Sequence, residues 1–453
     1  MSNLLGSLRN AAGAMRVIER GMAVVQSNVA NASTPGYARQ RQVLTAMAFD
    51  LDRGLVGGVA SGGTLDGRSL YAEQSVRRQA HSVGAAEERA AHLGRLEPVF
   101  GIDGAQGLSG ALNRFFQAAS ALGVTPNDDA ARQHLLSQAG MVAAAFQHTS
   151  AGLADAMAAA DRGIQANLND LNSLAERLRQ LNHHFKQDFR AQDDAGLDAQ
   201  LTNLLEELAE VTDFTALRAE DGSVSIFVGG QTPLVIGERL YPITTAPSAS
   251  GAALFDYEGH DITAQVSGGR LASLAALRNQ LLPGYQQSLD RLAERFATEV
   301  NATLAAGVDQ SGNPPAVDLF SFDATAGAAR TLQITAITAA ELALASPAAP
   351  GGNGNALALA NLEQQRLVDG ATFAQAYGAL AGLIGRDLST ARDEAQIQRQ
   401  LWAQARELRD EVSSVNLDEE AIALMEFQRA YQATAKVVQA VDRMMDDLMS
   451  LMR

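Results

Sequence analysis

Several residue types are scarce or missing in this chain of 453 residues. Cysteine is absent, which excludes disulfides, thiolate nucleophiles and cysteine-based zinc or iron–sulfur sites. The only lysines are Lys186 and Lys436, and the formal net charge is −16. We expect no basic face that could neutralise the phosphates of a nucleic acid or an anionic membrane surface.

Long apolar runs are also missing. No apolar stretch reaches the ~18 residues of a transmembrane helix, so no membrane insertion is expected. Near the start, Arg9, Arg16 and Arg20 interrupt the apolar pattern, which argues against a cleavable secretory signal. Hydrophobic residues nevertheless make up 47% of the chain, enough for at least one core.

What the chain does have is an amphipathic segment at each end. In both, apolar residues recur at alternating steps of three and four, which is typical of a coiled-coil seam. Only Thr434 departs from this pattern. The predicted seam positions are Leu4, Leu8, Ala11, Met15, Ile18, Met22, Val25 and Val29 in the first segment, and Leu424, Phe427, Tyr431, Val438, Val441, Met445, Leu448 and Met452 in the last.

Neither terminal helix is expected to be stable alone. Ordering about thirty residues costs about 1 to 2 kcal/mol each, and burying a seam side chain returns at most about 1.5 to 3 kcal/mol. Each helix therefore needs a partner, either the other end of the chain or further copies, and the seam residues are the predicted subunit interface. Alternatively, both helices pack on one globular core as ordinary amphipathic helices do.

Between the two ends the pattern is mainly helical. Alanine-rich helical periodicity from about Leu70 to Ala209 favours a helical bundle. Short strand-like segments occupy about 211–266. Helix then resumes with a predicted break at Pro283–Gly284, and two more helical segments are expected at 356–384 and 388–411.

The predicted fold class is mainly α with a small β portion. The terminal helices pair as a coiled coil, and the middle is a helical bundle with an inserted small β-sheet. The corresponding domains are a terminal coiled-coil domain, 1–45 with 412–453, and a middle mixed domain, 46–411.

Candidate catalytic and metal-binding groups are few. His183 and His184 are neighbours and point about 100° apart on a helix, so we do not expect them to share a metal. Asp309, Ser311 and Asn313 resemble the start of a calcium loop, but two prolines replace its continuation, so a loop turn is favoured. We expect no cofactor, no metal and no enzymatic activity.

A turn motif follows the first helical segment. Its residues are Asn28, Asn31, Thr34, Pro35, Gly36 and Tyr37. Pro35 disfavours helical geometry at the residue before it, and Pro–Gly fits the centre of a type II turn. The first helix is therefore predicted to end before this turn.

This motif resembles the Asn-x-x-Asn-x-x-Thr-Pro-Gly-Tyr segment shared by the axial proteins of the bacterial flagellum. Near the other end, residues 414–420 and 427–433 look like the C-terminal signature of the same proteins. The interior segments 269–320 and 355–362 are similar to the family of flagellar hook-associated protein 1, the first hook–filament junction protein.

The resemblance implies a secreted, extracellular structural ring between hook and filament, needed for motility. Its implied partners are further copies of itself, the hook protein, the second junction protein, an export chaperone and the flagellar type III export apparatus. Residues 320–355 are too few for the large outer domain of many members, so that domain is expected to be absent or reduced. The alternatives are another axial protein, of hook or rod, and an exported peptidoglycan-directed enzyme with axial-protein termini.

Overall fold

The computed structural model describes residues 2–50, 55–101, 107–188, 194–248 and 251–451. Contacts within the chain divide it into two compact units. The first unit comprises 1–82, 171–242 and 399–453, and the second comprises 83–170 and 243–398. Three helices contribute residues to both units: α2 (Leu70–Gly94), α5 (Asp129–Gln187) and α11 (Phe373–Ser413). The domain boundaries predicted at 45 and 412 remain predictions.

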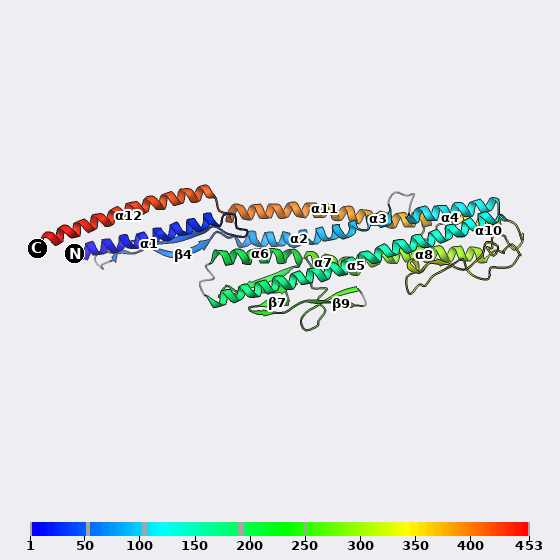
Figure 1. The fold of residues 1–453 in the computed structure, drawn as a ribbon, viewed down its shortest axis with the longest axis horizontal. Coiled ribbons are helices and arrows are strands. Elements are labelled where there is room, and N and C mark those ends of the chain that lie inside the picture. The colour runs from blue at the N-terminus through cyan, green and yellow to red at the C-terminus, as the bar shows by residue number, and fades with distance from the viewer. Residues whose placement is uncertain (1, 51–54, 102–106, 189–193, 249–250, 452–453) are drawn as a thin grey trace. The chain divides into compact units, whose positions relative to one another are not determined.

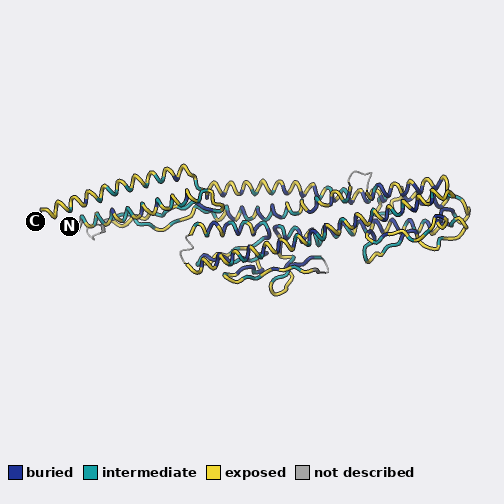
Figure 2. Tube along the Cα trace, in the orientation of Figure 1, coloured by how far each residue is buried: buried dark blue, intermediate teal, exposed yellow. Residues whose placement is uncertain are grey.

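The two ends of the chain pair with each other in the first unit. Helices α1 (Ser2–Ala30) and α12 (Leu417–Leu451) pack along one another, as Figure 1 shows. Most of α12 is exposed (Figure 2), and among its described residues only Glu420 and Val441 are buried. The mainly α fold class is confirmed, while the coiled-coil geometry of the terminal pair remains a prediction.

A long β-hairpin follows α1 in the first unit. Strand β1 (Gln40–Ala46) pairs antiparallel with β4 (Val59–Asp66), and the short strands β2 (Phe49–Asp50) and β3 (Leu55–Val56) pair next to them. The hairpin packs beside α1. At Gly58, where φ is 125°, a Cβ atom would lie 2.3 Å from Asn10 Oδ1, so a side chain here would collide with α1.

The first unit also holds α6 (Ala195–Val211) and a four-stranded antiparallel sheet. Its strands follow chain order: β5 (Phe214–Arg218), β6 (Val224–Val228), β7 (Thr232–Ile236) and β8 (Arg239–Leu240). The buried Asn182 of α5 holds the sheet by donating to the carbonyls of Val224 and Gly237, both at 2.7 Å. Its Oδ1 accepts the Val224 amide at 2.8 Å, so one side chain binds both the start of β6 and the turn between β7 and β8.

The second unit is built around a cluster of phenylalanines. The Phe296 ring lies 5.4 Å from Phe115, 5.3 Å from Phe320 and 5.4 Å from Phe373, distances at which aromatic pairs attract. Besides parts of α2, α5 and α11, the unit contains α3 (Glu97–Phe100), α4 (Gly107–Val124), α7 (Gly269–Ala276), the π-helical turn η2 (Leu277–Leu281), α8 (Leu282–Ala305), β11 (Phe320–Ser321), α9 (Ala328–Thr331), β12 (Gln333–Ile334) and α10 (Gly354–Asn361).

Three details of the middle segment differ from the sequence-based prediction. Strands β9 (Thr244–Ser248) and β10 (Gly251–Phe255) form a separate sheet in the second unit. The predicted break at Pro283–Gly284 was wrong, because η2 widens the helix before Pro283 and shifts the hydrogen-bond register where proline has no amide. The two segments predicted after 356 are instead the short α10 and the unbroken α11.

Candidate functional site

The turn motif forms the turn that its sequence predicts. The Tyr37 amide donates to the Thr34 carbonyl at 3.2 Å, and Gly36 has φ 73°, as a type II turn requires. Just before it, Asn31 donates to the Ser27 carbonyl at 3.0 Å and accepts from Thr34 Oγ1 at 3.3 Å. These local bonds end α1 and send the chain toward the hairpin.

Asn28 is the centre of the site. Its side chain is buried and makes four hydrogen bonds. Oδ1 accepts from the Tyr37 hydroxyl at 3.0 Å and the Gln40 amide at 2.9 Å, while Nδ2 donates to the Gln40 carbonyl at 2.9 Å and to Glu420 Oε2 at 3.0 Å. One amide side chain thus joins the end of α1, the turn and the first turn of α12.

Two glutamates at the start of α12 meet one arginine from the turn. Arg39 Nε donates to Glu420 Oε1 at 2.6 Å, its Nη1 pairs with Glu419, and its backbone amide donates to the Ser413 carbonyl at 2.8 Å. Burial disfavours the charged form of Arg39, but the two ion pairs outweigh it and raise its pKa. The cation is therefore firmly held between the two carboxylates.

The Tyr37 hydroxyl stays protonated in this setting. Burial raises the pKa of Tyr37, the Ser27 hydroxyl opposes the shift, and the nearby Glu420 charge adds to it. A protonated hydroxyl can donate to Asn28, which is the bond the structure contains.

The other side of the turn rests on α6. Asn203 Nδ2 donates to the Pro35 carbonyl at 2.9 Å. A Cβ atom at Gly36 would lie 2.7 Å from the Ala199 carbonyl oxygen and 2.7 Å from Asn203 Oδ1. Position 36 therefore requires glycine for two reasons, its positive φ and this close approach.

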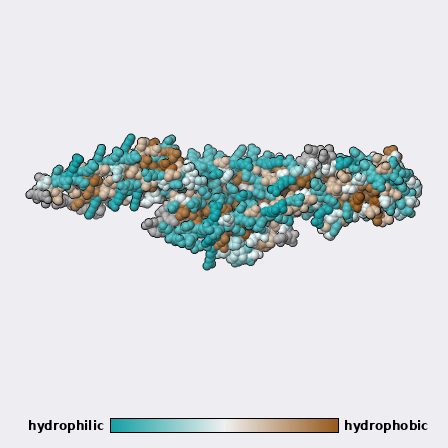
Figure 3. Space-filling view, in the orientation of Figure 1, coloured by the Kyte–Doolittle hydropathy of each residue, from teal (hydrophilic) through white to brown (hydrophobic). Residues whose placement is uncertain are grey.

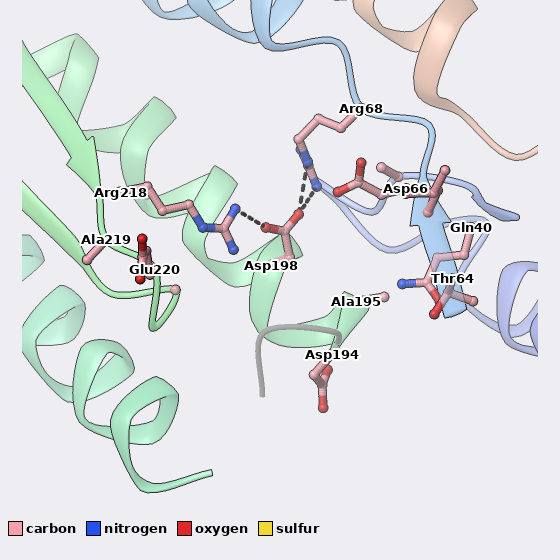
Figure 4. Close-up of a pocket in the computed structure, with 13 residues that line it drawn as sticks. Gln40, Thr64, Asp66, Arg68, Asp194, Ala195, Asp198, Arg218, Ala219 and Glu220 are labelled. Carbon is pink, nitrogen blue, oxygen red and sulfur yellow. Dashed lines mark hydrogen bonds and ion pairs between the residues drawn. The ribbon is translucent and has the colours of Figure 1, made fainter. Parts of the chain in front are cut away.

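A second ionic cluster extends the site toward the sheet (Figure 4). Arg68 donates to the Gly36 carbonyl at 2.8 Å and pairs with Glu73 and Asp198, each at 2.8 Å. Arg218 of β5 reaches the other oxygen of Asp198 at 3.1 Å. Arg68, Asp198 and Arg218 border a polar cavity of about 310 Å³, and the carboxylate of Asp198 is already shared by the two arginines.

The predicted seam residues occupy a range of environments. Ala11, Val25 and Val441 are buried, whereas Val29 and Leu448 are 45% and 41% exposed. Met452 lies outside the described residues. The remaining seam side chains are half-buried: Leu4, Leu8, Met15, Ile18, Met22, Leu424, Phe427, Tyr431, Val438 and Met445. Their role in binding other subunits stays a prediction.

Sequence reasoning missed two buried residues of α1, Val17 and Gly21. Gly21 is buried, and a Cβ atom there would lie 2.5 Å from Cζ of Phe427. The glycine thus gives the Phe427 ring room against α1. A small residue inside an apolar pattern is the only signal for such a contact, and that pattern does not say which ring will occupy it.

The histidine pair and the calcium-like loop, the other candidates from the sequence, form ordinary surface contacts. His183 Nδ1 lies 3.3 Å from Glu238 Oε1, and the two histidine rings are 6.4 Å apart. Asp309 Oδ1 accepts the amides of Ser311 and Asn313, both at 2.8 Å, which closes a local loop turn. Within the described ranges, no group of three or more acidic or histidine residues could hold a metal ion, and no helix is long and apolar enough to cross a membrane.

Two models of known protein families match this chain, one in the middle and one near the C-terminal end. Residues 93–320, half of the chain, match the model of the flagellar hook-associated protein FlgK helical domain. The chain belongs to the FlgK family. Residues 409–451 match a second model, that of the flagellar basal body rod FlgEFG protein C-terminal region, which includes Glu419 and Glu420 of the site.

Full-length FlgK-family relatives agree with this assignment. The chain is 24% identical to flagellar hook-associated protein 1 of Bacillus subtilis, covering 99% of both chains. It is 23% identical to that of Salmonella typhimurium, covering 100% of both. The latter alignment extends over 560 positions against 453 residues here, so that relative has segments which this chain lacks.

A solved FlgK structure has the same fold. The flagellar hook junction protein FlgK from Burkholderia pseudomallei superposes with a TM-score of 0.67 at 16% identity. The match covers 75% of this chain and 100% of the other. The fold implied by the terminal motifs together with the interior segments is thereby confirmed.

Proposed function

We propose that this chain is a structural junction protein of the bacterial flagellum that polymerises into a ring between hook and filament. Membership of the FlgK family and full-length similarity to hook-associated proteins 1 support this. The observation that carries the proposal is the terminal helix pair, held at the site around Asn28, in which α12 keeps much of its apolar surface exposed.

The exposed apolar side chains of α12 need further partners. Ile422, Met425, Val437 and Met444 are between 47% and 54% exposed although α12 already packs on α1. Figure 3 shows apolar surface over the first turns of α12. Burying an apolar side chain fully is worth about 1.5 to 3 kcal/mol, and a ring gains this in every subunit. Copies of the same helix pair are the partners we propose, with the seam residues contributing to the shared inner tube.

The resemblance of the terminal and interior segments implies the remaining partners, which we include in the proposal. A junction ring meets the hook protein on one side and the second junction protein on the other. Before assembly, an export chaperone covers the exposed face of α12, and the type III apparatus secretes the chain without cleavage. These contacts belong to the proposal.

A charge on the exposed face of α12 tests assembly separately from folding. Val437→Asp should leave the stability of the free chain within about 0.5 kcal/mol, because the side chain is 51% exposed. In a closed apolar contact the unpaired carboxylate would cost several kcal/mol per subunit. We expect hooks without filaments, and flagellin in the medium, when this variant replaces the native copy in the source organism.

The matched control is Gln439→Asp, which adds the same charge at an exposed polar position of the same helix. It should still support filaments. Val438→Asp serves as a third variant, because Val438 is half-buried and its loss should also loosen the helix pair in the free chain. Full-length filaments with Val437→Asp would contradict the proposed role of α12.

The enzyme alternative is not favoured by any observation at the site. The carboxylate Asp198 in the polar cavity is bound by Arg68 and Arg218 rather than left available as an acid or base. Release of soluble fragments from purified peptidoglycan by the full chain, lost on substitution of a cavity residue, would revive that alternative.

A further inference from the structure

The open edge of the β5–β8 sheet has unused hydrogen-bonding groups. Strand β5 stands at the end of the strand order, so among the described residues no strand pairs with its other side. The Asp213 carbonyl accepts the Gly229 amide, and the Ala219 amide donates to the Ser223 carbonyl. In this register the backbone amides and carbonyls of the odd-numbered residues of β5 point toward β6. Because the direction alternates, the amides and carbonyls of Phe214 and Ala216 point to the open side.

A cleft of about 280 Å³ lies along this open edge. Residues 214–216 of β5 form one wall, and the facing wall comes from α2. The α2 residues are Gln74, Arg77, Arg78 and His81, and Ala209 and Thr212 complete the lining. The cleft thus combines a strand edge with two arginines, in a chain whose net charge is −16.

The two arginines are not neutralised by their surroundings. Neither Arg77 nor Arg78 forms an ion pair with any residue that the structure describes. The acids that act on Arg77 are engaged elsewhere: Glu73 binds Arg68 at 2.8 Å, and Glu206 binds Arg409 at 2.9 Å. Burial accordingly lowers the pKa of Arg77. Burial lowers the pKa of His81, and the charge of Asp213 opposes that shift only in part.

We propose that this edge binds a short, extended, acidic segment of a partner protein, which adds to β5 as a further strand. Main-chain bonds to Phe214 and Ala216 would hold its backbone, and Arg77 and Arg78 would bind its carboxylates. The proposal concerns β5 and α2, and does not depend on ring assembly through α1 and α12.

Fluorescence anisotropy tests this binding. The full chain is titrated into a labelled peptide of alternating glutamate and valine. We expect saturable binding by the acidic peptide and none by the matching lysine–valine peptide. Arg78→Gln, at an exposed position, should weaken binding about tenfold, which corresponds to about 1.4 kcal/mol. Ala216→Pro should weaken it similarly, because it removes an amide on the open side and edge strands tolerate proline.

The matched control is Arg239→Gln, which removes an exposed arginine from β8 at the opposite edge of the same sheet. It should bind the acidic peptide like the unaltered chain. No binding by the unaltered chain, or equal loss with Arg239→Gln, would overturn the proposal. Binding that survives Ala216→Pro would refute strand addition. Self-association that Ala216→Pro abolishes, without peptide binding, would assign the edge to a second copy and also overturn it.

Discussion

Replacing Gly21 by alanine tests how closely α1 and α12 approach. In a helix interior, Gly→Ala normally stabilises by about 0.5 to 1 kcal/mol because glycine loses more backbone freedom on folding. At Gly21 the added Cβ would lie 2.5 Å and 2.7 Å from two carbons of the Phe427 ring and 2.9 Å from Gln42 Oε1. Carbon atoms in contact normally lie about 3.5 to 4.0 Å apart, so the ring must move by about 1 Å.

The same substitution at Gly13 provides the comparison. Gly13 also lies within α1, but nothing stands within 4 Å of a Cβ atom built there. At Gly21, overpacking costs about 1 to 3 kcal/mol and so offsets the gain in helix propensity. At Gly13 no neighbour is overpacked, so the gain in helix propensity remains. We therefore expect Gly13→Ala to stabilise the terminal pair by about 0.5 to 1 kcal/mol, and Gly21→Ala to be neutral or to destabilise it by up to about 2 kcal/mol.

Hydrogen exchange of the α1 amides measures this difference where it arises. Protection should rise with Gly13→Ala and stay level or fall with Gly21→Ala. In Gly21→Ala/Phe427→Ala the ring is gone, so the alanine should become favourable, a coupling that a double-mutant cycle detects. Equal stabilisation by both alanines, with no coupling to Phe427, would refute the close packing of the ring against Gly21.

Two further predictions concern buried polar groups. Asn28→Ala leaves the Tyr37 hydroxyl, both backbone groups of Gln40 and one Glu420 oxygen without their partner. We therefore expect the free energy of unfolding in urea to fall by about 2 to 4 kcal/mol. The control Asn31→Ala removes only local bonds, so its loss should be about 1 kcal/mol or less. Similar losses in both variants would contradict the central role of Asn28. Burial raises the pKa of Tyr377 to about 12 in the folded chain, compared with about 10 in an unfolded chain. The protonated hydroxyl therefore contributes fully to stability below pH 10, and this contribution is lost as the pH rises through the pKa of the folded chain. The free energy of unfolding should fall between about pH 10 and 12, and Tyr377→Phe should flatten that fall in an alkaline unfolding series.

Local signals in the sequence predicted the end of α1 and the turn that follows it. Pro35–Gly36 located this turn, and the side-chain bonds of Asn31 and Thr34 just before it are equally local. Each of these features depends on a few neighbouring residues, which is why the pattern suffices.

The long-range part of the site could not be predicted in this way. In the sequence, the helix dipole at the start of α12 is enough to explain a negative charge at Glu420. Nothing in the sequence marks Glu420 as a partner of Asn28. Arg68 and Asp198 likewise look like solvated surface charges until α6 packs under the turn. A hydrogen-bond partner hundreds of residues away is fixed by the folded path of the chain, which single-sequence periodicity does not contain.

The bond between Asn28 and Glu420 spans 392 residues, and this separation dictates an order of folding. During synthesis, α1 emerges first and waits until nearly the whole chain has been made before its partner helix exists. Closing so long a loop in a disordered chain is slow, but compaction of the intervening segments shortens the distance to be searched. The two ends are therefore expected to dock late, and a chain truncated before α12 should retain its second unit while α1 stays unpaired.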